Sequence, residues 1–359
     1  MDFLPRTSGA RPRLACELRS EGVIAARAEE ATDLLTSVSR APLNTTLPLV
    51  RVGEAPESHH FGPERASVVA AMRKAMDTVS QRGRELTLVI PDAAVRVLLL
   101  DFDALPSKPA EALPVVRFRL KKLVPFEVDH AAVSYQVMFS ARESIQVLAV
   151  AMPGDLLAEY ESVVREVGFE PGAVLPSTLA ALAGLRDADR PALIVNACQD
   201  AVTTAIARAG VLLLHRTVDL AATATPNSAL QPSPAAVPGD TGLSAIAARL
   251  SSAVSRPAAV TEPPRPAVPP ADISRTEVAQ AVSVATAYFE DTLEAHPSVI
   301  LAAGTLGAPA LTSILDSAGV KPLAVQELVD RNMLGVGAST GGSAIPLGWL
   351  AGVRGALAL

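Results

Sequence analysis

Residues 87–138, TLVIPDAAVRVLLLDFDALPSKPAEALPVVRFRLKKLVPFEVDHAAVSYQVM, decide the fold of this chain. Two runs rich in Leu, Val and Ile, at residues 86–90 and 95–101, predict strands, because branched apolar side chains suit a half-buried pleated surface. After a Pro-rich turn, residues 111–124 predict a helix with one apolar face, since apolar residues recur there at intervals of three or four: Leu113, Val116, Leu120 and Leu123.

The opposite face of this predicted helix is cationic. It carries Arg117, Arg119, Lys121 and Lys122 at helical spacing. A cationic stripe of this kind is most often only a solvated face, and in a minority of proteins it is a recognition surface. Both interpretations stay open at this point.

Composition limits the classes of function. The 359 residues are 49% hydrophobic, enough for a full core and for two to three domains. The net charge of -6 argues against nucleic-acid binding, which normally needs a basic domain. Cys16 and Cys198 stand far apart, and no Cys or His spacing matches a zinc site, so we expect neither a disulfide framework nor a metal.

The two ends of the chain predict a cytoplasmic protein. Residues 1–13 lack the apolar segment of a signal peptide, and no run of about 18 residues is free of charges and helix breakers. The apolar residues 343–359 contain Arg354 and Pro346, so we expect a buried final helix there.

Further elements follow from periodicity and turn residues. Helices are predicted at residues 63–81, 153–168, 179–185 and 274–295, the last with Ser274 and Glu277 as a capping box. A hairpin is predicted at residues 13–29 and a second one at residues 192–206 plus 211–218, turning at Ala209 and Gly210. Single strands are predicted at residues 43–53, 145–152 and 299–304.

One long stretch differs in composition from the rest. Residues 223–272 are rich in Pro, Ala and Ser, which predicts a linker or a largely disordered loop. Only residues 243–254 in its middle have the spacing of a short helix.

The order of motifs in the opening stretch resembles a known family. The pattern V-R-x-L-x-L-D-F-D-x-L-P at residues 95–106, followed by F-R-L-K-K-x-x-P-F at 118–126, closely resembles the accessory subdomain of the type IV pilus assembly protein PilM family. The cytoplasmic domain of the type II secretion protein GspL is related to that family. The resemblance implies an α/β, actin-like (ribonuclease H-like) two-half fold with an inserted α/β accessory subdomain.

That fold implies a division of the chain, since each half should begin with one of the predicted hairpins. We expect a flexible tail at 1–12, a first half at 13–83 and 171–190, an inserted subdomain at 84–170, a second half at 191–222 and 272–359, and the linker at 223–271.

The resemblance also places a nucleotide site between the halves, and this chain departs from the family there. In the first hairpin the carboxylate position is Glu17, but the glycine position is Arg19, followed by Ser20. An arginine there either binds phosphate itself or, as we favour, is a turn residue that points to solvent. Its side chain would occupy space that a phosphate needs.

The second and third nucleotide motifs are altered as well. The aspartate and glycine of the second hairpin become Asn196 and Cys198, and an amide cannot hold Mg²⁺ or act as a base as a carboxylate does. Of two family glycines in the third motif only Gly304 remains. These vestigial positions favour a chain that hydrolyses no ATP and needs no cofactor, with an ATP- and Mg-binding switch of weak ATPase activity as the alternative.

The implied function is therefore a non-catalytic cytoplasmic scaffold of a type IV pilus assembly or related secretion machine, held at the inner membrane by its partners. The family resemblance implies that the main partner is the cytoplasmic tail of a bitopic PilN-like protein, bound between the inserted subdomain and the first half. A pilus assembly ATPase, other machine components and self-association are further candidates. For the groove wall we expect Arg117, Phe118, Lys121, Lys122 and Phe126, although both phenylalanines are equally compatible with core packing.

Overall fold

The computed structural model describes residues 12–29, 34–50, 56–80, 83–141, 144–185, 191–220, 270–294, 297, 299–320, 323–335 and 345–358. The predicted tail at 1–12, apart from Pro12, and the linker at 223–271, apart from its last two residues, lie outside the described residues, as does the short helix expected at 243–254.

Two five-stranded sheets have the same plan. The first has the order β3 (Leu35–Pro42), β2 (Gly22–Ala28), β1 (Leu14–Arg19), β4 (Glu85–Ile90) and β8 (Glu170–Pro176). The second has the order β11 (Val211–Asp219), β10 (Ala201–Arg208), β9 (Ala192–Ala197), β12 (Val299–Gly304) and β13 (Ala324–Glu327). In each, three antiparallel strands continue into two parallel ones. This repetition confirms the actin-like, two-half fold.

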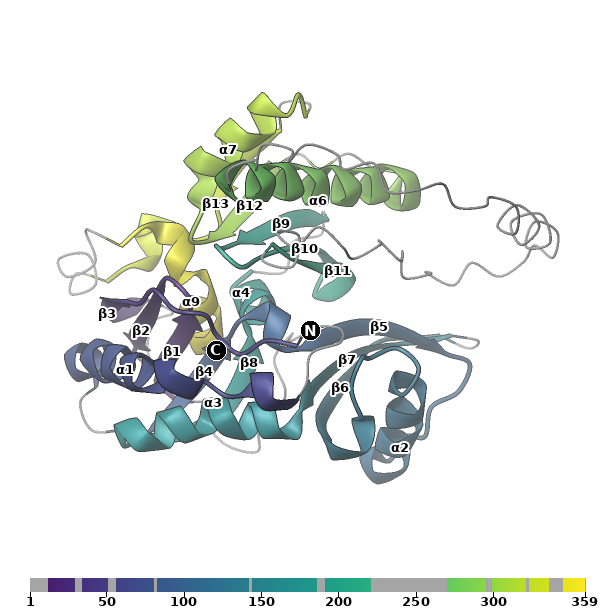
Figure 1. Ribbon diagram of the computed structural model, residues 1–359. Coiled ribbons are helices and arrows are strands. Elements are labelled where there is room, and N and C mark those ends of the chain that lie inside the picture. Colours follow the sequence, from purple (N-terminus) through teal and green to yellow (C-terminus); the bar gives the residue numbers. More distant parts are fainter. Residues whose placement is uncertain are drawn as a thin grey trace, which may run out of the picture.

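The helices form layers around these sheets (Figure 1). Helices α1 (Arg65–Val79) and α3 (Gly154–Val167) cover the outer face of the first sheet. Helices α6 (Pro270–Leu293) and α7 (Gly307–Ser317) cover the second, while α4 (Ser177–Ala183) and α9 (Ala351–Leu357) lie between the sheets. None of the described helices is long and apolar enough to cross a membrane.

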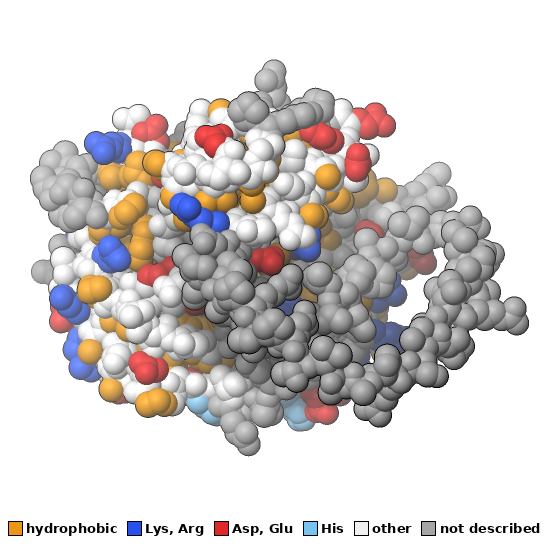
Figure 2. Space-filling view, turned by 45° about the horizontal axis from the view of Figure 1, so that its top comes forward, with side chains coloured by type: hydrophobic (Ala, Val, Ile, Leu, Met, Phe, Trp, Pro, Cys, Tyr) orange, Lys and Arg blue, Asp and Glu red, His pale blue; other side chains and the backbone are white. Residues whose placement is uncertain are grey.

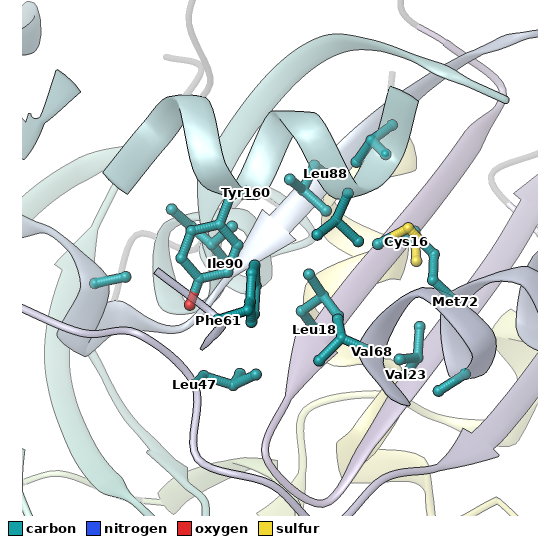
Figure 3. Close-up of a cluster of buried hydrophobic side chains, with 14 of the residues drawn as sticks. Cys16, Leu18, Val23, Leu47, Phe61, Val68, Met72, Leu88, Ile90 and Tyr160 are labelled. Atoms are coloured by element: carbon teal, nitrogen blue, oxygen red, sulfur yellow. The ribbon is translucent and has the colours of Figure 1, made fainter. Parts of the chain in front are cut away.

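Strand β1 is buried along its whole length because helices cover both of its faces, as is usual for central strands. Its side chains alternate between two cores. Cys16 and Leu18 pack under α1 and α3 with Phe61 and Tyr160, as Figure 3 shows, whereas Ala15 packs toward α9. The Tyr160 hydroxyl donates a 2.9 Å hydrogen bond to a backbone carbonyl oxygen of the segment before α1, which ties that segment to α3.

A third, three-stranded sheet forms the inserted subdomain. Its order is β5 (Arg96–Phe102), β7 (Ile145–Pro153) and β6 (Ala131–Ser140), and α2 (Pro109–Leu120) packs on one face. The insertion predicted at 84–170 is therefore too wide. Strand β4 and helix α3 belong to the first half, where the fully apolar end of β4 is buried as a central parallel strand between β1 and β8.

Three other sequence predictions were wrong. Residues 43–50 form no strand; they cross the core as an irregular segment. The strand in this region is β3, which comes directly before them and was missed because its sequence is polar and half-buried. Helix α6 begins at Pro270, so Ser274 lies inside the helix and is no cap. Helix α9 packs into the first half rather than the second half to which 272–359 was assigned.

The remaining elements agree with the sequence patterns. The helices predicted at 63–81, 153–168 and 179–185, the turn at Ala209 and Gly210, and the buried C-terminal helix are all present, and the second predicted hairpin consists of three strands. On the face shown in Figure 2, charged side chains of both signs are interspersed with apolar ones.

Candidate functional site

Polar side chains gather where the two halves meet, at the carboxyl ends of β1, β4 and β9 and at the start of α4. In α/β proteins this edge of a sheet is where ligands usually bind. The polar residues Glu17, Arg19, Asp92, Ser177, Thr178 and Asn196 are buried there. We call them the cleft network.

Arg19 points into the protein. Its Nη2 atom lies 2.6 Å from Glu17 Oε1 and donates to Ser177 Oγ at 3.1 Å, while Ser177 Oγ donates to Glu17 Oε1 at 2.6 Å. The side chain is only 4% exposed, so the favoured interpretation, a turn arginine directed to solvent, was wrong. Glu17 and Arg19 are two apart on β1 and so project from the same face, which brings carboxylate and guanidinium together.

Burial and neighbouring charges together shift the pKa values of this pair. Burial raises the pKa of Glu17, although the charge of Arg19 and the hydrogen bond from Ser177 oppose the rise. For Arg19, burial disfavours the charged form, but the nearby charges of Glu17 and other acids leave its pKa above the ordinary value. The second carboxylate oxygen, Glu17 Oε2, makes no hydrogen bond within the described structure and lies against Gly352 of α9.

Asp92 of the first half is linked to the second half by the side-chain amide of Asn196. It follows β4 in a short 3-10 helix, η3 (Asp92–Ala94), and accepts from the Thr178 backbone N–H at 2.9 Å and from the Thr178 hydroxyl at 2.5 Å. Asn196 Nδ2, in the second half, lies 2.9 Å from Ser177 Oγ, 3.0 Å from Thr178 Oγ1 and 3.3 Å from Asp92 Oδ2. The amide at position 196 is therefore a donor that links the two halves.

Glu21 makes a second link between the halves. It lies in the turn between β1 and β2, and its Oε1 accepts from the Gln199 backbone N–H at 2.6 Å and from the Thr305 hydroxyl at 2.7 Å. Ser20 Oγ donates to the other oxygen at 3.1 Å. Ser20, which the family resemblance places in the nucleotide site, thus donates its hydroxyl to a protein carboxylate.

Three backbone N–H groups in loops and at helix starts donate to protein carboxylates. Backbone N–H groups in loops and at helix N-termini are the usual phosphate donors of such clefts. Here the N–H of Thr178 donates to Asp92, that of Gln199 to Glu21, and that of Ala308, at the start of α7, to Glu327 at 2.8 Å.

The remaining predicted site residues have structural partners as well. The Cys198 thiol is 3.3 Å from the carbonyl oxygen of Ala201, and burial together with Glu21 raises its pKa to about 12. A Cβ atom at Gly304 would overlap the carbonyl oxygen of Ala197 in β9, so a glycine is needed there for strand packing alone.

The cavity that borders the cleft network is small. A cavity of about 20 Å³ is bordered by Glu17, Arg19, Asp92, Asn196 and Cys198. That volume holds about one water molecule. Within the described ranges, no three His, Cys, Asp or Glu side chains are grouped so that they could hold a metal ion.

Sequence reasoning missed Asp92, Ser177, Thr178, Glu21 and Thr305. Asp92 could have been found, because it directly follows a predicted buried strand, at the edge where polar residues of neighbouring strands converge. Ser177 and Thr178 begin α4, whereas Glu21 and Thr305 follow strands. Their partners on other elements lie 18 to 284 residues away in the sequence, and no local pattern marks them.

The five residues expected for the groove wall have different surroundings in the structure. Arg117 is a structural residue, because its guanidinium donates to the carbonyl oxygens of Val128 at 2.5 Å and Ala131 at 3.0 Å. Phe126 is partly buried against the cores of the first half and the insertion, in keeping with the core-packing interpretation. Lys121 pairs with Asp129 at 2.8 Å on the surface, and Phe118 and Lys122 are exposed.

A groove between the insertion and the first half lies elsewhere. It runs between β6 and β8, each an edge strand of its own sheet, and has a cavity of about 80 Å³. Its rim comes from Ser134, Tyr135 and Gln136, and its apolar lining from β7, β8 and α4: Leu148, Val150, Val174, Leu175, Pro176 and Leu179. We call this the β6–β8 groove.

Comparison with known proteins rests on structure. No family model and no curated protein sequence matches this chain. A chain of the PilM–PilN type IV pilus biogenesis complex is similar, at 15% identity and a TM-score of 0.63, over 96% of this chain and 98% of that one. The cytoplasmic domain of EpsL, an inner membrane component of the type II secretion system of Vibrio cholerae, is 13% identical, with a TM-score of 0.35, over 59% of this chain and 72% of that one.

A protein with an actin-like ATPase fold from Bacteroides thetaiotaomicron is also similar, at 9% identity and a TM-score of 0.45, over 90% of this chain and 92% of that one. The similarity to the PilM–PilN complex extends over nearly the full length of both chains and includes the inserted subdomain. The resemblance to the PilM family that the motifs at 95–126 predict is thus confirmed at the level of the fold.

Proposed function

We propose that this chain is a non-catalytic scaffold on the cytoplasmic side of a type IV pilus assembly or related secretion machine. It binds the short cytoplasmic tail of a bitopic inner-membrane protein similar to PilN. The observation that carries this proposal is the common fold over 96% of this chain with a chain of the PilM–PilN complex.

The closed cleft supports the non-catalytic part of the proposal. Phosphoryl transfer needs a bound nucleotide, a metal ion and donors aimed at the transferred group. In this chain Asp92, Glu21 and Glu327 already accept the backbone hydrogen bonds of the cleft, and the Glu17–Arg19 pair occupies its centre. An opening of the halves for ATP would have to break the bonds that cross between them, from Gln199 and Thr305 to Glu21 and from Asn196 to Asp92, Ser177 and Thr178.

The β6–β8 groove supports the partner part of the proposal. An extended peptide can bind between two edge strands, whose free backbone groups give affinity while side-chain pockets give specificity. The floor is apolar, with Leu148, Leu175 and Leu179 nearly fully buried. A peptide with alternating apolar side chains fits this lining, and the tail of a membrane protein would tether the chain to the inner membrane.

Binding can be measured by calorimetry with synthetic peptides that match the cytoplasmic tails of bitopic proteins encoded beside this chain. Val174→Arg places a charge in the groove lining and should weaken the affinity at least about tenfold, because a buried charge without a partner is strongly unfavourable. The matched control is Val284→Arg on α6, where the side chain is exposed. Full affinity in Val174→Arg, or equal loss in both variants with unchanged melting temperature, would contradict the groove assignment.

A further inference from the structure

Helix α2 has an exposed face that the rest of the chain leaves uncovered. Val115, Phe118, Arg119 and Lys122 recur at spacings of three and four, and Leu123 follows in the turn after the helix. The side chain of Phe118 is 69% exposed, Leu123 47% and Val115 37%. We call these five residues the α2 outer face.

The packing of α2 explains which side remains outside. Ala112, Val116 and Leu120 are fully buried against the three-stranded sheet, so the helix is anchored by one stripe only. Arg117 beside that stripe is held by the backbone of Val128 and Ala131. The orientation of α2 is therefore fixed, and Phe118 stands outward on a rigid element.

The net charge around this face is positive. Residues 108–130 contain five Lys or Arg and three Asp or Glu, although the whole chain has a net charge of -6. Two of the three acids are engaged, since Glu111 pairs with Lys108 and Asp129 with Lys121. Arg119 and Lys122 make no ion pair with any other described residue, so the cations beside Phe118 are available to an outside anion.

We propose that the α2 outer face docks on an anionic membrane surface. Exposed aromatic and aliphatic side chains flanked by Lys and Arg are the composition of interfacial helices, whose apolar residues enter the headgroup region while the cations contact lipid phosphates. The cationic, convex ridge complements an anionic lipid layer in charge. A bilayer also adapts to a ridge of any shape.

The size of the face favours lipid over a folded protein partner. A standard protein interface buries about 800 Å² per partner, and three apolar side chains on one helical ridge cannot supply that area. For a lipid surface a few inserted side chains give weak, reversible binding, which a second attachment makes stable. The inference rests on the proposed function in this respect, because the tail of the membrane partner provides the second attachment.

The test is flotation of the full-length chain with vesicles of phosphatidylglycerol and phosphatidylcholine, compared with vesicles of phosphatidylcholine alone. We expect binding only to the anionic vesicles, weaker at high salt because exposed charges are screened. Each basic residue near an anionic surface changes the partition coefficient about fivefold, so Arg119→Glu with Lys122→Glu should lower it at least about 20-fold. Phe118→Ser should lower it as well.

Matched controls separate this surface from general electrostatic attraction. Lys74→Glu with Arg208→Glu changes the net charge by the same amount at two exposed positions on other elements, and Val284→Ser removes an exposed apolar side chain from α6. Both controls should leave vesicle binding unchanged.

Absence of binding by the unmodified chain, equal binding to neutral vesicles, or equal loss in the controls would overturn the inference. Loss of tail binding in Phe118→Ser without vesicles would identify the face as a protein interface and would overturn it too. The flotation assay contains no partner tail, so it fails independently of the peptide titration that tests the proposed function.

Discussion

The carboxylate of Glu21 accepts a 2.7 Å hydrogen bond from the hydroxyl of Thr305, which connects the turn of the first hairpin with the end of β12 in the opposite half. The same oxygen also accepts the backbone N–H of Gln199. A single side chain thus links the two halves, and the bond to Thr305 joins residues 284 positions apart in the sequence.

This relationship predicts energetic coupling between the halves. Thr305→Val and Glu21→Gln should each lower the free energy of unfolding by about 1–2 kcal/mol, because each removes a hydrogen bond to a charged group. In the double variant the losses should be less than additive by about 1 kcal/mol. Urea unfolding measures all three, with Thr78→Val on the exposed face of α1 as a control expected to be neutral. Strict additivity would show that the bond does not hold in solution.

The Glu17–Arg19 pair predicts a destabilisation that depends on pH. Arg19→Met leaves a buried carboxylate without its cation, which should cost about 3 kcal/mol at pH 8. Burial already raises the pKa of Glu17, and loss of the arginine raises it further. A raised folded-state pKa means that stability is fully present below the ordinary glutamate value and is lost as the pH rises through the folded value. The defect should therefore shrink between pH 8 and pH 5.

A second substitution serves as the control for this pair. Glu17→Gln combined with Arg19→Met removes both charges, so most of the stability should return and the pH trend should disappear. Urea unfolding at pH 5 and pH 8 gives the comparison. A defect of equal size at both pH values would mean that packing around the arginine side chain, and not its charge, is what matters.

Local patterns gave most of the elements and only part of the site. Strands β4 and β9 were predictable because they are rich in consecutive apolar residues, as in strands covered on both faces. Glu17 and Asn196, which the family resemblance places between the halves, border the cavity there because both lie near the carboxyl end of a central strand. The polarity of Arg19 suggested solvent, although its counter-charge Glu17 stands two residues away on the same face of the strand and could have indicated a buried pair.

The partner surface was harder to predict for a related reason. The apolar face of α2 was visible in the sequence, but which cations on the other face are already engaged depends on the return of the chain at residues 128–131. The β6–β8 groove joins residues from three separate elements and from two sheets. Its edge strands became recognisable only once the strand order was known.

The closed cleft predicts that Mg-ATP neither binds nor turns over. A ligand that binds only the native state at 100 times its Kd would stabilise it by about 2.7 kcal/mol and raise the Tm by several degrees. We expect no Tm change in a thermal shift assay with millimolar Mg-ATP and no phosphate release above background. A clear upward shift, or turnover that Glu17→Ala abolishes, would favour the ATP-dependent switch instead.

The segment at residues 56–64, which precedes α1 and which we call the strap, predicts a loss of stability in acid. In this segment His59 Nδ1 lies 2.9 Å from Asp155 Oδ2, and Glu159 on α3 accepts the Phe61 N–H at 3.2 Å and pairs with Arg65 at 2.9 Å. Burial disfavours the charged form of Glu159, but these hydrogen bonds and charges outweigh burial and lower the pKa of Glu159. In the same way, the hydrogen bonds from His59 and from the backbone lower the pKa of Asp155.

The lowered folded-state pKa of Glu159 makes stability change with pH in the opposite direction from Glu17. The stability that Glu159 contributes is present above the ordinary glutamate pKa and is lost as the pH falls through the lower folded value. Wild type should therefore exceed Glu159→Gln in unfolding free energy at pH 6 and approach it near pH 3. The control, Glu111→Gln on the exposed side of α2, should show no such convergence. A difference between wild type and Glu159→Gln that stays constant from pH 6 to pH 3 would mean that shape alone, rather than the charge of Glu159, holds the strap on α3.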